Sequence, residues 1–292
     1  MERRILVPLD GSPLAERALP CAVMLASEMP AELVLFQSVL VPREWSDGER
    51  DSRLGQLDAE AREYLAQVAG RLDRDGLGVS WVVEHGPAAE SIVDCGVDTQ
   101  LIVMATHGRS GANRWARGSV AERVLQASST PVLMICALQP PPQDGLVRCR
   151  RILVPLDGSP VAEQVLPSVI SIAKALDAQV ILLRVSIVQT SGEFQGDLLM
   201  PLVGNLQTAD RIAQEYLDQV ASRLLDDGVR VATTVQRGAV AEVIVDYAQD
   251  YTVDLIAMCT HGQTGLGRWA LGRVSDRVLR SGCRPLLLTR AG

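Results

Sequence analysis

The stretch that decides the fold is RRILVPLDGSP at residues 3–13, which recurs without change at residues 150–160. In each copy a short apolar run ends at an Asp-Gly turn, a pattern typical of a buried parallel strand. The Ser-Pro pair that follows favours a helix, because serine caps a helix and proline fits its first turn. Each copy is therefore expected to begin with a strand, a turn and a helix.

A second repeated stretch lies near the end of each copy. The letters THG at residues 106–108 are followed by RWA at 114–116, and both return at 260–262 and 268–270. Two repeated stretches in the same order indicate that the chain is a duplication. The second copy has a few additional residues, which we expect in a loop around residues 190–204.

The length and a proline-rich stretch define the expected domains. The chain has 292 residues, which suits two domains of about 150 residues each. Between the copies lies LQPPPQDG at residues 138–145, whose prolines oppose both helix and sheet. We predict a first domain at residues 1–138, a linker at 139–147 and a second domain at 148–292.

Strand and helix patterns alternate along both copies. The expected strands are residues 5–9, 33–36, 79–83, 101–104 and 132–135, then 152–156, 180–183, 229–235, 255–258 and 286–288. Helical spacing occurs at residues 54–72, 88–95 and 119–126. This alternation predicts the α/β class, with two tandem doubly wound, parallel, five-stranded sheets of Rossmann-like architecture.

Composition excludes several functions. The formal net charge of -7 argues against a protein that coats nucleic acid or anionic lipid. No apolar run approaches the roughly 18 residues of a membrane span. Lys174 is the single lysine and follows no glycine loop, which excludes a Walker A phosphate loop. The six cysteines form no Cys-x-x-Cys pair and no metal-ligand spacing, so we expect reduced thiols in a cytoplasmic protein.

The carboxyl ends of the expected strands are the natural place for a ligand. In doubly wound sheets, ligands bind in the crevice beyond these ends, where the strand order reverses. Asp10 and Asp157 follow the first strand of each copy, and Met104 and Met258 end the fourth. The aspartates also fit a structural role, because aspartate caps tight turns and a Gly-Ser pair follows each of them.

A glycine loop follows the fourth strand. Gly108 and Gly118 are separated by nine residues, and Ser119 follows directly at the start of an expected helix. Glycines allow a ligand to approach the backbone, and the free N–H groups at a helix start attract an anion. A phosphate group is the natural ligand for such a loop, although turn glycines and a capped helix also fit the pattern.

This loop, together with VPLDGS at residues 7–12, resembles the universal stress protein family. The resemblance covers nearly the whole chain, and it implies a tandem universal stress protein with an adenine nucleotide alpha hydrolase-like fold. The family pattern is Gly, two residues, Gly, nine residues, Gly, then Ser or Thr. Members with this pattern bind ATP, and members without it generally act as dimeric scaffolds.

For the first copy the resemblance implies an ATP site, with or without Mg²⁺. The implied residues are Pro8 and Asp10 around the adenosine, the backbone near Ser38 at the adenine, Met104 and Ala105 at the floor, and Gly108, Gly118, Ser119, Val120 and Ala121 at the phosphates. The one departure is Ala105, which adds a methyl group where the family has its first glycine.

The second copy departs further from the family pattern. Cys259 replaces the first glycine, and Arg273 stands where Ser or Thr is expected. Arginine lacks the small hydroxyl, and its guanidinium could grip a phosphate or fill the pocket as a substitute cation. We therefore expect nucleotide mainly in the first domain, and less at the equivalent residues Asp157, Val185, Met258, Gly262 and Gly272.

These patterns favour an ATP-binding stress-response or signalling module over two alternatives, a nucleotide-free dimeric scaffold and a slow ATP hydrolase. We find no nucleophile–base pair and no Gly-x-Ser-x-Gly elbow, so we expect no enzyme activity beyond weak ATP hydrolysis. The final strands, 132–135 and 286–288, are apolar and need covering. Family members pair these strands, which implies an internal pseudo-dimer of the two copies, with a homodimer also plausible.

Overall fold

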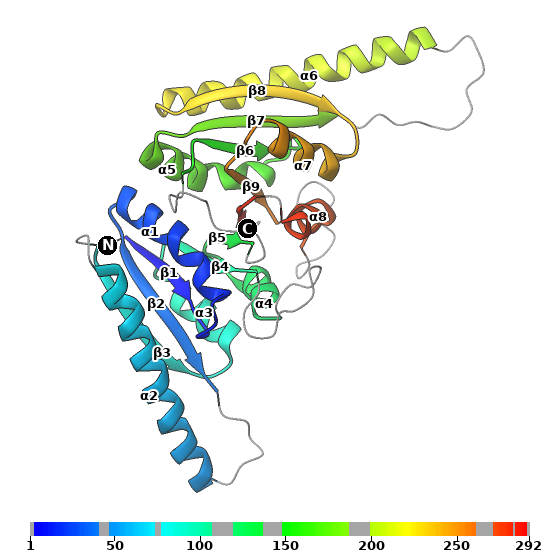
Figure 1. The fold of residues 1–292 in the computed structure, drawn as a ribbon. Coiled ribbons are helices and arrows are strands. Elements are labelled where there is room, and N and C mark those ends of the chain that lie inside the picture. The colour runs from blue at the N-terminus through cyan, green and yellow to red at the C-terminus, as the bar shows by residue number, and fades with distance from the viewer. Residues whose placement is uncertain are drawn as a thin grey trace. The chain divides into compact units, whose positions relative to one another are not determined.

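The computed structural model describes residues 3–40, 47–73, 77–106, 119–136, 148–186, 199–260, 271–282 and 284–290. The chain forms two compact units (Figure 1). The first comprises residues 1–148 together with residues 287–290, and the second comprises residues 149–286.

The first unit alternates strands and helices from its beginning. Its elements are β1 (Arg4–Pro8), the 3-10 helix η1 (Ala15–Ala18), α1 (Leu19–Glu28), β2 (Glu32–Val39), α2 (Asp47–Leu72), β3 (Val79–His85), α3 (Ala88–Gly96), β4 (Leu101–Ala105), α4 (Ser119–Ala127) and β5 (Val132–Ile135).

The second unit repeats this order. Its elements are β6 (Arg151–Pro155), the 3-10 helix η3 (Ala162–Val165), α5 (Leu166–Leu176), β7 (Gln179–Ser186), α6 (Leu199–Asp226), β8 (Arg230–Arg237), α7 (Val240–Asp250), β9 (Leu255–Cys259), α8 (Arg273–Ser281) and β10 (Leu286–Thr289). The end of β10, from Leu287 onward, groups with the first unit.

The strand order in each unit is that of a doubly wound sheet. It runs β3-β2-β1-β4-β5 in the first unit and β8-β7-β6-β9 in the second. The strand pairs within these two series are parallel. The predicted α/β class and parallel winding are therefore confirmed. The order reverses between β1 and β4, and between β6 and β9, so the crevice for a ligand lies beyond Pro8 and Pro155.

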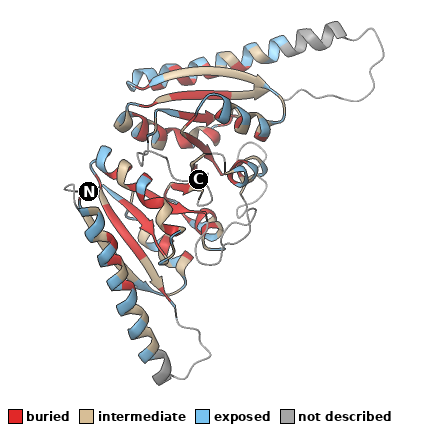
Figure 2. Ribbon diagram, in the orientation of Figure 1, coloured by how far each residue is buried: buried red, intermediate tan, exposed pale blue. Residues whose placement is uncertain are grey.

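Apolar strands form the core of each unit (Figure 2). The central strands β1 and β4 are buried almost throughout, as are β6 and β9. Because parallel strands are covered on both faces, they read as continuous apolar runs rather than as alternating ones. Helix α2 packs on β2 and β3, α3 packs beside α4, and α6 packs on β7 and β8.

Two predicted elements differ from the structure. The helix expected directly after Ser12 and Pro13 begins as the 3-10 helix η1, and the α-helix starts only at Leu19. Ser12 still acts as a cap, because its Oγ accepts a hydrogen bond from the Ala15 N–H at 3.2 Å. The loop expected around residues 190–204 was placed too far along the chain, since α6 already begins at Leu199.

Candidate functional site

The turn after the first strand is built in the same way in both units. The Asp10 carboxylate accepts a hydrogen bond from the Ser12 N–H at 3.0 Å, and the Asp157 carboxylate accepts one from the Ser159 N–H at 3.0 Å. The intervening glycine has a φ of +79° in the first unit, a conformation that disfavours side chains. Each aspartate therefore has a structural role, because it caps the turn that follows the first strand. It also lies at the carboxyl end of that strand, where a ligand is expected.

The end of β2 is joined to the loop after β3. Ser38 Oγ donates a hydrogen bond to the Gly86 carbonyl at 2.6 Å, and the Gly86 N–H donates to the Val39 carbonyl at 3.0 Å. The Ser38 hydroxyl is thus engaged within the protein. The family resemblance implies that the backbone, not the side chain, of Ser38 contacts adenine. The hydrogen bond made by the hydroxyl does not affect that backbone contact. In the second unit, Val185 is half-buried in β7.

The predicted floor of the site is part of the sheet core. Pro8 ends β1 and is buried, and Met104 and Ala105 end β4 with side chains 5% and 7% exposed. Their equivalents Met258 and Cys259 end β9 in the same way, at 8% and 5%. These apolar groups end their strands at the sheet edge where the family resemblance places the floor of the site.

The first turn of α4 carries the predicted phosphate contacts. Ser119 is exposed at the first position of the helix, Val120 is half-buried and Ala121 is 2% exposed. Gly108 and Gly118, which precede the helix in the family pattern, lie outside the described residues. A hydroxyl is therefore presented at the helix start, next to the backbone N–H groups that a helix leaves unbonded there.

The first turn of α8 is tied back to the end of β9. The Gly272 N–H donates to the Thr260 carbonyl at 2.7 Å, and Ser275 Oγ lies 2.9 Å from both the Thr260 and the Gly272 carbonyl oxygens. Ser275 thus supplies a hydroxyl, but it turns toward protein carbonyls. Arg273 is exposed, and Gly262 lies outside the described residues.

Two residues that the sequence analysis missed occupy equivalent places near these turns. Gln37 follows Phe36, which pairs with Pro8 at the end of β1, and Arg184 follows Leu183, which pairs with Pro155 at the end of β6. The Gln37 Oε1 and Arg184 Nη1 atoms are buried without a hydrogen-bond partner in the described part of the chain. An unpaired buried polar atom is costly, so such atoms point to a missing partner or a special role.

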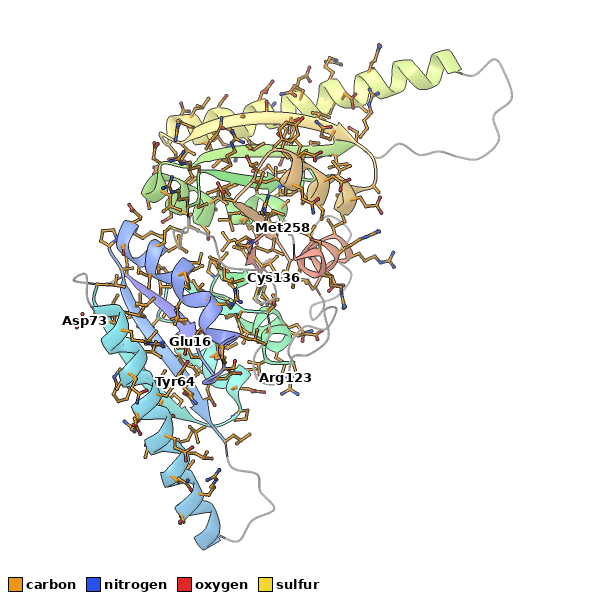
Figure 3. The ribbon with its side chains drawn as sticks, in the orientation of Figure 1. Glu16, Tyr64, Asp73, Arg123, Cys136 and Met258 are labelled. Atoms are coloured by element: carbon orange, nitrogen blue, oxygen red, sulfur yellow. The ribbon has the colours of Figure 1, made fainter. Side chains whose placement is uncertain are left out.

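A hydrogen-bonded cluster braces the first unit beside its turn. Tyr64 Oη on α2 donates to Glu16 Oε1 at 3.0 Å, and Arg71 Nη2 donates to Glu16 Oε2 at 2.9 Å. Figure 3 shows Glu16 and Tyr64 close together. Burial raises the pKa of Tyr64, and its bond to the Glu16 carboxylate raises that pKa further. The tyrosine therefore remains a neutral donor.

The same cluster recurs in the second unit with one addition. Tyr216 Oη donates to Glu163 Oε1 at 2.9 Å, and Arg223 Nη2 donates to Glu163 Oε2 at 2.5 Å. Here the Arg184 guanidinium also lies over the Tyr216 ring, with Cζ 5.5 Å from the ring centroid. Contacts between residues about fifty positions apart leave no local signal in the sequence, which is why the analysis missed both clusters.

Two kinds of feature are absent from the described residues. No group of three or more His, Cys, Asp and Glu side chains there is arranged to hold a metal ion. Within the same residues, none of the helices combines the length and the apolar character needed to cross a membrane.

Comparisons with known proteins agree on one family. The family model for universal stress proteins matches residues 1–135 and 148–290. The chain is 24% identical over 301 residues to a universal stress protein of Mycolicibacterium smegmatis, covering 99% of this chain and 97% of the relative. A universal stress protein of Methanocaldococcus jannaschii is 33% identical over 141 residues, covering 48% of this chain and 82% of the relative.

A solved structure shares the fold over nearly the whole chain. The crystal structure of a universal stress protein from Archaeoglobus fulgidus DSM 4304 superposes with a TM-score of 0.74 at 20% identity, covering 99% of this chain and 98% of that chain. At this identity the likeness concerns the fold alone.

Proposed function

Because the chain belongs to the universal stress protein family, we propose that it is a cytoplasmic stress-response or signalling module whose first unit binds ATP. Pro8, Asp10, Met104 and Ala105 all lie at the carboxyl ends of β1 and β4 or directly after them, where the strand order reverses. This is where doubly wound sheets bind nucleotides.

The observation that best supports ATP is the unpaired acceptor of Gln37. Its Oε1 atom is buried without a hydrogen-bond partner among the described residues, one position beyond the pairing of β2 with the end of β1. If the Gln37 side chain turns toward the crevice, its amide oxygen suits a ligand that presents an N–H group, such as the amino group of adenine. The residues on this edge therefore fit the base of the nucleotide.

The start of α4 suits the phosphates. The exposed Ser119 hydroxyl and the positive end of the helix dipole favour an anion at this position. Any Mg²⁺ would be held chiefly by the phosphate oxygens, as is usual for this ion. In this proposal the protein residues position ATP, and a partner senses the charge and shape of the ATP-bound unit.

We propose that ATP acts as a switch or stabiliser rather than as a consumed substrate. The described site residues offer apolar walls, a turn carboxylate and a hydroxyl, which together hold a ligand but form no nucleophile–base pair. Slow hydrolysis and a nucleotide-free scaffold remain the alternative predictions. Slow but steady conversion of ATP to ADP by the purified protein would favour the hydrolase, and failure of both units to bind nucleotide would favour the scaffold.

The test is calorimetric titration of ATP into the wild type, Ser119→Ala and Gly272→Ala. Loss of a hydroxyl bonded to a charged phosphate should weaken binding by about 1–3 kcal/mol. Gly272 has an ordinary φ of −59°, which alanine can adopt, so Gly272→Ala is the second-unit comparison and should weaken binding less than Ser119→Ala does. Equal loss in both variants would contradict a first-unit site.

A separate proposal concerns the association of the two copies and of whole chains. The internal pseudo-dimer of the two copies and a further homodimer remain predictions that rest on the apolar final strands and on the family. Sedimentation equilibrium of the full chain tests the homodimer. A mass equal to one chain at all concentrations would reject it.

A further inference from the structure

Gln37 and Arg184 are the same position in the two copies. Each lies one residue beyond the pair that joins the second strand to the end of the first, Pro8 with Phe36 in one unit and Pro155 with Leu183 in the other. Each also directly precedes the residue whose backbone is expected to contact adenine. A difference between the copies here would act on the base end of the site.

The Arg184 side chain lies across the turn of its own unit. A Cβ atom placed on Gly158 would clash with Arg184 Nη1 and would lie 3.1 Å from Cζ and 3.2 Å from Nη2. The guanidinium also lies over the Tyr216 ring, with Cζ 5.5 Å from the ring centroid. The group therefore lies against both the ring and the backbone of the turn that begins at Asp157.

Arg184 also changes the charge beside that turn. The first unit has a neutral amide at this position, and the second has a guanidinium that is always charged. Burial raises the pKa of Tyr216, and the Glu163 carboxylate raises it further; smaller effects come from Arg184, which lowers this pKa, and from Asp157, which raises it. A cation held against Gly158, the residue after Asp157, would compete with ribose hydroxyls for the carboxylate, and its bulk would crowd a base at this edge.

We propose that Arg184 closes the nucleotide site of the second unit from within, whereas Gln37 at the same position leaves the first site open. This inference rests on the proposed function and adds the residue that makes the two sites unequal. Arg184 thus fills the site from the base end, unlike Arg273, which is exposed at the first position of α8.

The experiment exchanges the two residues. ATP is titrated calorimetrically into the full-length wild type, Arg184→Gln, Gln37→Arg and the double exchange. We expect one ATP per chain in the wild type and two in Arg184→Gln. Gln37→Arg should weaken the first site at least about tenfold, a difference of about 1.4 kcal/mol. The double exchange should restore one site, now in the second unit.

Arg230→Gln is the matched control, because it removes an exposed arginine at the start of β8, in the same unit but away from the turn and the glycine loop. Arg273→Ser tests the competing idea that Arg273 fills the second site. Both variants should remain at one ATP per chain. Cooperative urea unfolding of each variant checks that it folds. If Gln37→Arg fails this check, Arg184→Gln alone decides.

The outcomes separate the two proposals. One ATP per chain in both the wild type and Arg184→Gln overturns the role of Arg184 but leaves the first-unit site in place. The same conclusion follows if a second ATP binds only in Arg273→Ser. Two ATP in the wild type also overturns the role of Arg184. No ATP in the wild type but one in Arg184→Gln supports that role while rejecting the first-unit site. No ATP in either rejects both.

Discussion

Asp58 and Asp210 show at the residue scale how the two copies have diverged. Asp58 accepts hydrogen bonds from Arg62 Nε at 2.5 Å and from His85 Nε2 at 2.8 Å. Asp210 instead pairs with Arg237 and accepts a hydrogen bond from Ser186 Oγ at 3.0 Å. The Asp58 carboxylate is thus shared by an arginine and a histidine, and the Asp210 carboxylate by an arginine and a serine.

These contacts predict a pH dependence of stability. The hydrogen bond from Arg62, and then that from His85, lowers the pKa of Asp58 in the folded state. A lowered carboxylate pKa adds stability above the unfolded value of about 3.9, and this contribution disappears as the pH falls through the folded value. The pair is near the surface, so we expect Asp58→Asn to cost at most about 1 kcal/mol at pH 7.

Urea unfolding of the wild type and Asp58→Asn between pH 7 and pH 2.5 measures this effect. The two curves should differ at neutral pH and approach each other as the pH falls through the lowered folded pKa of Asp58, below which the carboxyl is protonated in both states. A difference that persists unchanged at the lowest pH would show that Asp58 contributes by packing rather than by charge.

The turn after β6 provides the prediction at the scale of the element. Gly158 has a φ of +82° and Gly228 has a φ of +79°, so alanine should cost each about 1–2 kcal/mol through the backbone alone. A Cβ atom on Gly228 would meet nothing within 4 Å, whereas one on Gly158 would clash with Arg184. Gly158→Ala should therefore be the more destabilising change.

A double-mutant cycle isolates this contact. The excess cost of Gly158→Ala over Gly228→Ala should shrink when Arg184→Gln is also present, because the shorter side chain relieves the clash. The free energy of unfolding in urea is the measurement. Equal costs for the two glycine variants in the wild-type background would mean that the end of the Arg184 side chain moves off the turn at little cost.

Most elements could be predicted because their signals are local. The strand at residues 132–135 was predicted with its observed bounds, and other strands differ by a few residues at their ends, where polar residues continue the ladder beyond the apolar run. The entry into α1 was wrong in detail, because the 3-10 turn at η1 depends on the geometry of the Asp-Gly-Ser turn. The start of α6 was missed because the apolar pattern at residues 199–204 was taken as part of a loop.

At the scale of the whole molecule, the sequence alone predicts the duplication. It predicts the differences between the two copies only in part. Cys259 and Arg273 break a linear motif, so they could be found by comparing the two copies. Gln37 and Arg184 lie inside strands, and their significance depends on the register of β2 and β7 and on the long helices that pack there. Such tertiary contacts carry no short-range pattern.

The central claim is that ATP binds at the carboxyl edge of the first unit. Hydrogen–deuterium exchange of the full chain with and without ATP tests it most directly, because it reports each unit separately. We predict slower exchange in peptides that cover residues 8–12 and 101–121, with no change in those that cover residues 155–159, 255–260 and 271–276. Protection of the second-unit peptides, alone or to an equal degree, or protection of none, would contradict the claim.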